Sequence, residues 1–263
     1  MGILNVTPDS FSDGGQFSST DKAITHALEM CTHGAHIIDI GGESTRPGAD
    51  VVSEADELAR ILPVIEGLVS ENLSAQISID TRRPKVAKAA IKAGASIWND
   101  VTALSFEANS ISMAAELGCE IVLMHMKGTP KTMQENPVYD NVVDEVCTYL
   151  KRRLEAAMAG GVQAKNIILD PGIGFGKRLE DNLLLLAEVD DLNALGYRVL
   201  IGASRKNFIS MIDKSPADAR LGGSLASALW AANLGASIVR VHDVKETAQA
   251  LKVWQAMRKQ KNG

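Results

Sequence analysis

The chain has 263 residues, of which 46% are hydrophobic and 22% are charged, and its formal net charge is −5. These values are typical of a globular protein and argue against a nucleic acid or an anionic membrane as partner. No apolar run approaches the roughly 20 residues that a membrane span needs, and no basic leader precedes an apolar segment, so we expect a cytoplasmic protein. Cys31, Cys119 and Cys147 lack CxxC spacing, which favours reduced thiols over disulfides or a zinc site.

Eight short apolar runs recur along the chain, and each ends at, or a few residues before, a polar or charged residue. A stretch with apolar residues at helical spacing follows each run. This repeat predicts an α/β protein, with residues 1–263 forming one (β/α)8 TIM barrel whose active site lies at the C-terminal ends of the strands. The predicted strands are Gly2–Val6, Ile37–Ile40, Ile77–Ile79, Ser96–Trp98, Ile121–Met124, Ile167–Leu169, Val199–Ile201 and Ile238–Val241.

The helical patterns between the runs carry recognisable start signals. Ser53 is a predicted N-cap, because acidic residues follow it in the first turn, and Pro84 suits a first helical position. Long loops follow the first, second and fifth runs, where we expect them to serve the site. The predicted helices are Thr20–Thr32, Ser53–Leu68, Pro84–Ala93, Asn109–Leu117, Asn141–Met158, Asn182–Leu195, Leu221–Leu234 and Glu246–Lys259.

Three polar residues, Asp80, Asn99 and Asp170, follow strands rich in Val, Ile and Leu. At the barrel mouth they would offer hydrogen-bond acceptors and donors to a flat nitrogen heterocycle such as an amino-pyrimidinone, since an ionised Asp accepts only and Asn does both. The alternative is structural: Asp80 before Pro84, and Asp170 before Pro171, would cap helices or hold loops.

Other strand ends carry groups suited to an anion. Arg240 and His242 are two residues apart on one strand face, and Lys206 follows the seventh run, where barrels commonly hold phosphate. Asn5 could ligate Mg²⁺ together with phosphate oxygens, and Arg46 beside Thr45 suits a carboxylate or phosphate. Read alone, Asn5 could satisfy backbone groups, His242 could be a core histidine, and Lys206 could be solvated.

Several long motifs, one per strand in order, make the chain resemble the dihydropteroate synthase family from Met1 to about Lys259. They include GILNVTPDSFSDGG, DIGGESTRPGA, LMHMKGTPKTMQ, LDPGIGFGK and IVRVHDV. The resemblance implies a (β/α)8 barrel, Mg²⁺ as cofactor, and a transferase. The implied reaction joins p-aminobenzoate to 6-hydroxymethyl-7,8-dihydropterin diphosphate, giving 7,8-dihydropteroate and pyrophosphate. Sulfonamides that compete with p-aminobenzoate are therefore expected inhibitors.

The resemblance also implies roles for individual residues. The pterin ring would lie on Asp80, Asn99, Asp170 and Lys206, and the diphosphate on Asn5 with Mg²⁺, Thr45, Arg240 and His242. The p-aminobenzoate side would be formed by Phe11, Asp13, Thr45, Arg46, Pro47, Phe175, Lys206 and Asn207. Asp80, Asp170, Lys206, Arg240 and His242 would serve the chemistry, in which pyrophosphate departs as the arylamine attacks and no protein nucleophile is needed.

The chain departs from the family pattern at two points. Asn207 stands where many relatives have Ser near the p-aminobenzoate carboxylate, so we expect altered affinity. Relatives usually carry a short segment before the first strand, which bears on stability more than on chemistry.

Two other functions remain open on the sequence. A pterin-binding methyltransferase domain would share the Asp/Asn/Asp ring site, but Ser44–Pro47 and the Arg240/His242 pair are better suited to diphosphate and aminobenzoate. A non-catalytic pterin binder would not need Asn5, Arg46, Lys206 and Arg240. The family is generally dimeric, and Leu221–Leu234 fits either an interface helix or a core-facing one.

Overall fold

A computed structural model describes residues 1–7, 15–43, 52–129 and 132–262. Eight parallel strands follow one another in a single order, β1 to β8. The barrel closes where Gly2 pairs with Val241, with hydrogen bonds from the Ile3 amide to the Val241 carbonyl and from the Val241 amide to the Met1 carbonyl. The strands are β1 Gly2–Asn5, β2 Ile37–Gly41, β3 Gln76–Asp80, β4 Ile97–Asp100, β5 Glu120–Met124, β6 Ile167–Asp170, β7 Arg198–Ile201 and β8 Ile238–Val239.

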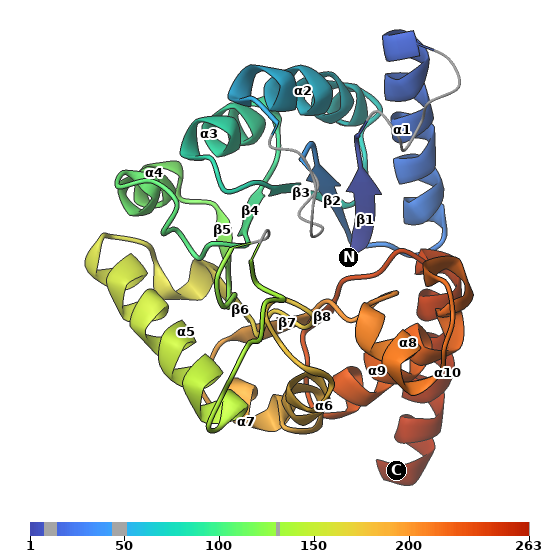
Figure 1. Ribbon diagram of the computed structural model, residues 1–263. Helices are drawn as coiled ribbons and strands as arrows, with labels where there is room; N and C mark the ends of the chain where they lie inside the picture. Colours follow the sequence, from blue (N-terminus) through green and yellow to red (C-terminus); the bar gives the residue numbers. More distant parts are fainter. Residues whose placement is uncertain (8–14, 44–51, 130–131, 263) are drawn as a thin grey trace.

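Helices form a ring outside these strands, and α1 and α10, from opposite ends of the chain, complete it beside β1 (Figure 1). The predicted (β/α)8 barrel is therefore confirmed. Among the described residues, no helix is long and apolar enough to cross a membrane. The helices are α1 Gly15–Thr32, α2 Glu54–Ser70, α3 Pro84–Ala93, α4 Ser110–Leu117, α5 Val142–Ala159, α6 Leu179–Ala187, α7 Val189–Asn193, α8 Asn207–Ile212, α9 Leu221–Asn233 and α10 Val244–Asn262.

Local signals position several helices as the sequence predicts. The Ser53 hydroxyl accepts a hydrogen bond from the Asp56 amide at 3.1 Å at the start of α2, and Pro84 is the first residue of α3. Such contacts satisfy or remove amide groups that have no partner within the helix.

The C-terminal half of the barrel departs from two predicted helix boundaries. The helix predicted over Asn182–Leu195 begins earlier and divides into α6 and α7 at Glu188, whose φ of −111° and ψ of 36° are not helical. The structure also contains α8, which the sequence pattern does not predict. This helix is only six residues long, too short for a clear helical period, and it is fixed by burial of Phe208 and Ile209.

The barrel interior explains where the site lies. Its central apolar layer consists of Ile37, Ile97, Val122, Ile168 and Leu200, with Met1 and Ile238 packed against it. In a strand, residues two apart point to the same face. The next inward layer toward the C-terminal ends therefore changes from aliphatic to mostly polar: Asp39, Asn99, Met124, Asp170, Gly202 and Arg240. Asp80 follows the same spacing from the buried Ser78 on β3.

Candidate active site

Four polar side chains, from β2, β3, β4 and the residue after β8, form one hydrogen-bonded network in this layer. Arg240 donates through Nε to Asp39 Oδ2 at 2.6 Å and through Nη2 to Asp80 Oδ2 at 2.8 Å. Asn99 Nδ2 donates to the same Asp39 oxygen at 3.1 Å. The network joins Arg240, which the sequence suggests for diphosphate, to Asp80 and Asn99, which it suggests for the pterin.

Asp39 is the polar residue of the second apolar run, and the sequence motifs assign it no role in the site. Its side chain is 0% exposed, and Oδ1 has no hydrogen-bond partner among the described residues. Asp39 lies inside β2, with Ile40 and Gly41 after it, so its place in the run alone does not give it a role at the barrel mouth. The available signal was its spacing: Asp39 follows the inward-facing Ile37 by two residues, just as Asn99 follows Ile97.

Charge is unevenly balanced across this network. Burial raises the pKa of Asp80 to about 7; Arg240 opposes this shift and Asp39 adds to it. Burial opposes the charged form of Arg240 as well, but Asp39 and Asp80 outweigh it and raise the pKa of the guanidinium. Arg240 is therefore a permanent cation between two carboxylates, and Asp80 is poised to exchange a proton near neutral pH.

Asp170 lies at the end of β6 and is held mainly by backbone groups. Its Oδ1 accepts a hydrogen bond from the Gly172 amide at 2.7 Å, and its carbonyl oxygen accepts one from the His125 amide at 2.9 Å. Burial raises the pKa of this carboxyl to about 6, against the opposing effects of the Gly172 hydrogen bond and the Lys206 charge. A short turn thus orients the Asp170 side chain.

Lys206 and Phe175 lie together, as the predicted p-aminobenzoate side requires. The Lys206 ammonium is 4.1 Å from the centre of the Phe175 ring, a cation–π contact. Lys206 immediately precedes α8, and Asn207 begins that helix with an exposed side chain. Before Lys206, Arg205 has a φ of 57°, a conformation that non-glycine residues adopt rarely and mostly where the surrounding structure enforces it.

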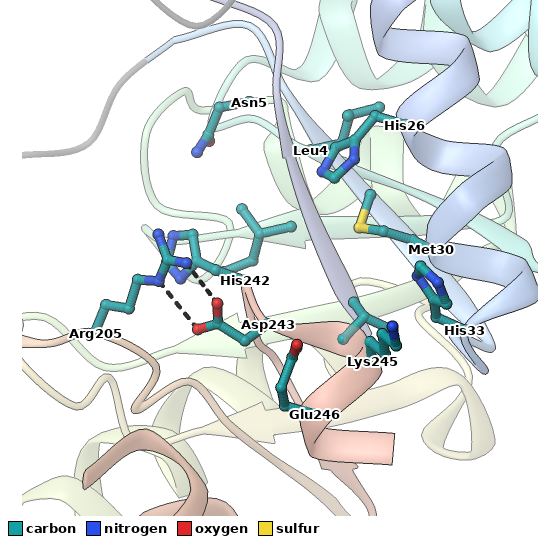
Figure 2. Close-up of a pocket in the computed structure, with 12 residues that line it drawn as sticks. Leu4, Asn5, His26, Met30, His33, Arg205, His242, Asp243, Lys245 and Glu246 are labelled. Atoms are coloured by element: carbon teal, nitrogen blue, oxygen red, sulfur yellow. Dashed lines mark hydrogen bonds and ion pairs between the residues drawn. The ribbon is translucent and has the colours of Figure 1, made fainter. Parts of the chain in front are cut away.

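His242 and Asn5 border a second part of the site. His242 Nδ1 is 3.0 Å from Ser204 Oγ, and the same hydroxyl accepts the His242 amide at 3.1 Å. Burial, helped by Arg240, lowers the pKa of His242 to about 4, so the ring is neutral near pH 7. A cavity of about 470 Å³ adjoins Asn5, His242 and Arg205 and extends to α1 and the start of α10 (Figure 2).

The described ends of the loop after β2 are tied together. Arg83, just before α3, donates to Glu43 at 2.9 Å, to the Val52 carbonyl at 2.6 Å, and to the buried Glu57. One guanidinium therefore fixes both flanks of residues 44–51. Five of the predicted site residues lie outside the described residues: Phe11, Asp13, Thr45, Arg46 and Pro47.

The described residues fit a magnesium ion that is held largely by a substrate. No group of three or more His, Cys, Asp or Glu among them could hold a metal. Asn5, however, lies beside Gly41, where an added Cβ would be 3.8 Å from Asn5 Oδ1 and 3.9 Å from Asp80 Oδ2. The missing side chain leaves room beside the Asn5 oxygen. One amide oxygen with substrate phosphate oxygens is a usual way to bind Mg²⁺, which rarely occupies an all-protein cage.

Comparisons with known proteins show the family to which the chain belongs. Residues 1–242 match the family described as pterin binding enzyme. The dihydropteroate synthase of Haemophilus influenzae is 47% identical over 256 residues, covering 97% of this chain and 92% of the relative.

Two solved structures share the fold over nearly the whole chain. The Yersinia pestis dihydropteroate synthase, in complex with a sulfonamide drug, has a TM-score of 0.93 and 44% identity, covering 98% of this chain and 94% of that one. The Xanthomonas albilineans enzyme with 4-aminobenzoic acid has a TM-score of 0.92 and 46% identity, covering 98% and 92%. The polar barrel layer thus occurs in a chain that belongs to the dihydropteroate synthases, within the family of pterin-binding enzymes.

Proposed function

We propose that the protein joins p-aminobenzoate to 6-hydroxymethyl-7,8-dihydropterin diphosphate, forming 7,8-dihydropteroate and pyrophosphate. The observation that carries this proposal is the connected layer of Asp80, Asn99 and Arg240 beside Asp170. In this layer, the hydrogen-bond acceptors that suit a pterin lie beside Arg240, a cation that suits its diphosphate. The amine nitrogen forms a bond to the pterin methylene carbon, the bond from that carbon to the diphosphate oxygen breaks, and the amine releases a proton.

The pterin end is served by two carboxylates at opposite sides of the ring site. Ionised Asp80 and Asp170 accept hydrogen bonds from the amino and ring N–H groups. Their negative charge also stabilises a ring that becomes more positive as pyrophosphate departs. Asn99 has a fixed orientation because its Nδ2 donates to Asp39.

The diphosphate end is served by Arg240, His242 and Asn5. Arg240 keeps its charge in the buried site and stabilises the negative charge that grows on the leaving oxygen. The neutral His242 ring donates one N–H to a phosphate oxygen while Ser204 fixes the ring orientation. Mg²⁺, bound through the Asn5 oxygen and substrate oxygens, would add positive charge to the leaving group.

The amine end rests on Lys206 and Phe175, with Asn207 at the mouth. The ring of p-aminobenzoate packs against Phe175, and its carboxylate lies toward the Asn207 end of α8. The sequence motifs assign five further residues to the p-aminobenzoate side: Phe11, Asp13, Thr45, Arg46 and Pro47. We also assign Thr45 to the diphosphate.

Product formation and drug competition test the proposal together. With both substrates and Mg²⁺, the purified protein should form dihydropteroate, and a sulfonamide should raise the apparent KM for p-aminobenzoate without changing the maximal rate. If the folded protein binds a pterin but forms no dihydropteroate, or if the inhibition constant lies far above the KM for the amine, this function is wrong.

We also propose a homodimer formed through α6, α8 and α9, which pack against one another (Figure 1). These helices expose large apolar side chains: Trp230 is 54% exposed, Met211 56% and Ile212 61%. Such groups mark interaction surfaces when they gather. Sedimentation should give twice the chain mass, and Trp230→Lys should shift the protein toward the monomer. A monomer at all concentrations would contradict the proposal.

We propose a cytoplasmic location, since all three cysteines are unpaired and unpaired thiols suit a reducing compartment. Fractionation of cells expressing the chain would test it: recovery outside the cytoplasm would contradict it.

A further inference from the structure

Lys177 is a buried lysine that the proposed reaction does not use. It ends the glycine-rich turn between β6 and α6, and it is only 4% exposed. Its Nζ donates to the Gly172 carbonyl at 2.9 Å and to the Phe175 carbonyl at 3.0 Å, and it lies 3.0 Å from His125 Nδ1. Three acceptors thus match the three protons of an ammonium group. Burial lowers the pKa of the Lys177 ammonium to about 7, and the charge of the Asp170 carboxylate opposes this shift.

His125 is suited to accept one of these protons. It follows β5 and is 5% exposed, with the Tyr149 ring edge-on at a centroid distance of 4.9 Å. Burial, and then the neighbouring Lys177, lower the pKa of His125 to about 3. The imidazole is therefore neutral, and with Lys177 charged its Nδ1 is the acceptor. This contact ties the end of β5 to the turn after β6.

The two carbonyl groups that Lys177 binds belong to the residues that hold the site. The Gly172 amide donates to the Asp170 carboxylate at 2.7 Å. The Phe175 ring contacts the Lys206 ammonium at 4.1 Å. Lys177 is therefore linked to Asp170 through Gly172, and to Lys206 through Phe175.

The turn is closely packed at two of its glycines. Gly172 has a φ of 68°, and an added Cβ would lie 1.9 Å from the His125 carbonyl oxygen. An added Cβ on Gly174 would lie 3.1 Å from Lys206 Cδ. The turn is thus packed between the β5 loop and Lys206, and Lys177 closes it from within.

We propose that Lys177 is a positioning residue: by binding the Gly172 and Phe175 carbonyls against His125, it holds Asp170 and Lys206 in place for the pterin. Lys177 itself does not touch a substrate. The proposal rests on the proposed function, because it assigns Asp170 and Lys206 to the pterin.

The first test compares Lys177→Met with Lys165→Met, an exposed lysine in the short turn before β6. Affinity for 6-hydroxymethylpterin is measured by calorimetry, with Tm as the control for folding. Lys177→Met should weaken binding about tenfold, which is about 1.4 kcal/mol, and Lys165→Met should leave it unchanged. A folded Lys177→Met protein with unchanged affinity would overturn the proposal.

A double-mutant cycle separates positioning from a general loss of structure. If Asp170 and Lys206 each transmit part of the effect, Lys177→Met should cost only about threefold in an Asp170→Asn or a Lys206→Met background. The full tenfold loss in both backgrounds would mean that Lys177 acts through neither residue and would overturn the proposal.

The histidine partner gives a test that does not depend on Lys177→Met folding. His125→Gln keeps a side-chain oxygen that can accept from Lys177, whereas His125→Leu does not. His125→Gln should bind the pterin within about threefold of the unaltered protein, and His125→Leu should lose about tenfold. Equal losses would overturn the proposal. Amine-dependent pyrophosphate release by the unaltered protein decides the proposed function separately.

Discussion

Asp80 and Asp170 are both buried carboxylates at the ends of parallel strands, but the protein holds them in different ways. Asp80 faces Arg240, which also binds Asp39 from the neighbouring strand. The Asp170 carboxylate accepts a hydrogen bond from the Gly172 amide, and Lys177 binds the carbonyl of the same glycine. One side of the ring site is therefore held by opposite charges that bridge the barrel, and the other by the local fold of one loop.

Substitutions on the two sides should therefore have different effects. On the Arg240 side, removal of one partner leaves another buried charge unpaired, so binding, chemistry and stability should suffer together. On the turn side, a substitution disturbs orientation and leaves the charges of the barrel interior in place. The predictions that follow test this contrast.

Arg240→Met should have the largest effect. It removes the cation that we assign to the leaving group and leaves Asp39 and Asp80 together without their partner. We expect kcat/KM to fall by about 10³ and stability to fall by about 3 kcal/mol, as measured by steady-state kinetics and urea unfolding. Arg198→Met, at a partly exposed ion pair with Glu120, is the control. If kcat/KM stays within tenfold of the value for the unaltered protein, Arg240 does not stabilise the leaving group.

Asp80→Asn and Asp170→Asn compare the two sides directly. Each should weaken pterin binding by about 30-fold, because a charged acceptor becomes a neutral amide. Asp80→Asn should also lower kcat, since Arg240 loses one of its two carboxylates, while Asp170→Asn should change kcat little. Calorimetry gives the affinity and initial rates give kcat. A fall in kcat in Asp170→Asn but not in Asp80→Asn would contradict the proposed difference between the two sides.

Asp39→Asn tests the residue inside β2. The substitution keeps the shape but removes the charge that orients Arg240, so we expect kcat/KM to fall by about 20-fold. Ser78→Ala, a buried neighbour on β3, is the matched control. Unchanged kinetics in a folded Asp39→Asn protein would show that Asp80 alone orients Arg240.

Pterin affinity should depend on pH through the same carboxylates. Burial raises both pKa values, to about 7 for Asp80 and about 6 for Asp170. As the pH falls from 8 to 6, each carboxyl takes up a proton and loses an acceptor, so affinity should fall by about tenfold. Calorimetry across this pH range measures the affinity. In Asp80→Asn, the pH at which half of the affinity change has occurred should move toward 6. Tighter binding at low pH would contradict the assignment.

The strand ends were predictable because the polar residues there interrupt runs of Val, Ile and Leu. That signal predicted the order of the barrel, and the structure places Asp80, Asn99, Asp170 and Arg240 in its polar layer. Asp39 is the polar residue of the second run in the same way, but no motif gives it a role, and only the inward spacing from Ile37 indicates that it faces Arg240.

The turn side was less accessible from sequence. A Gly-rich segment after a strand indicates close approach, but not what approaches; at Gly172 the near neighbour is the His125 carbonyl, from another strand. The role of Lys177 depends on contacts between residues 52 positions apart, which no local pattern encodes. The short helix α8 likewise depends on burial of Phe208 and Ile209 against the rest of the barrel.

The most direct test of the account is pyrophosphate release by the purified protein from 6-hydroxymethyl-7,8-dihydropterin diphosphate and Mg²⁺, measured with and without p-aminobenzoate. The account predicts release that requires the amine, with one dihydropteroate formed for each pyrophosphate, and loss of both in Arg240→Met. Folded protein that binds the pterin diphosphate but shows no amine-dependent release would contradict it.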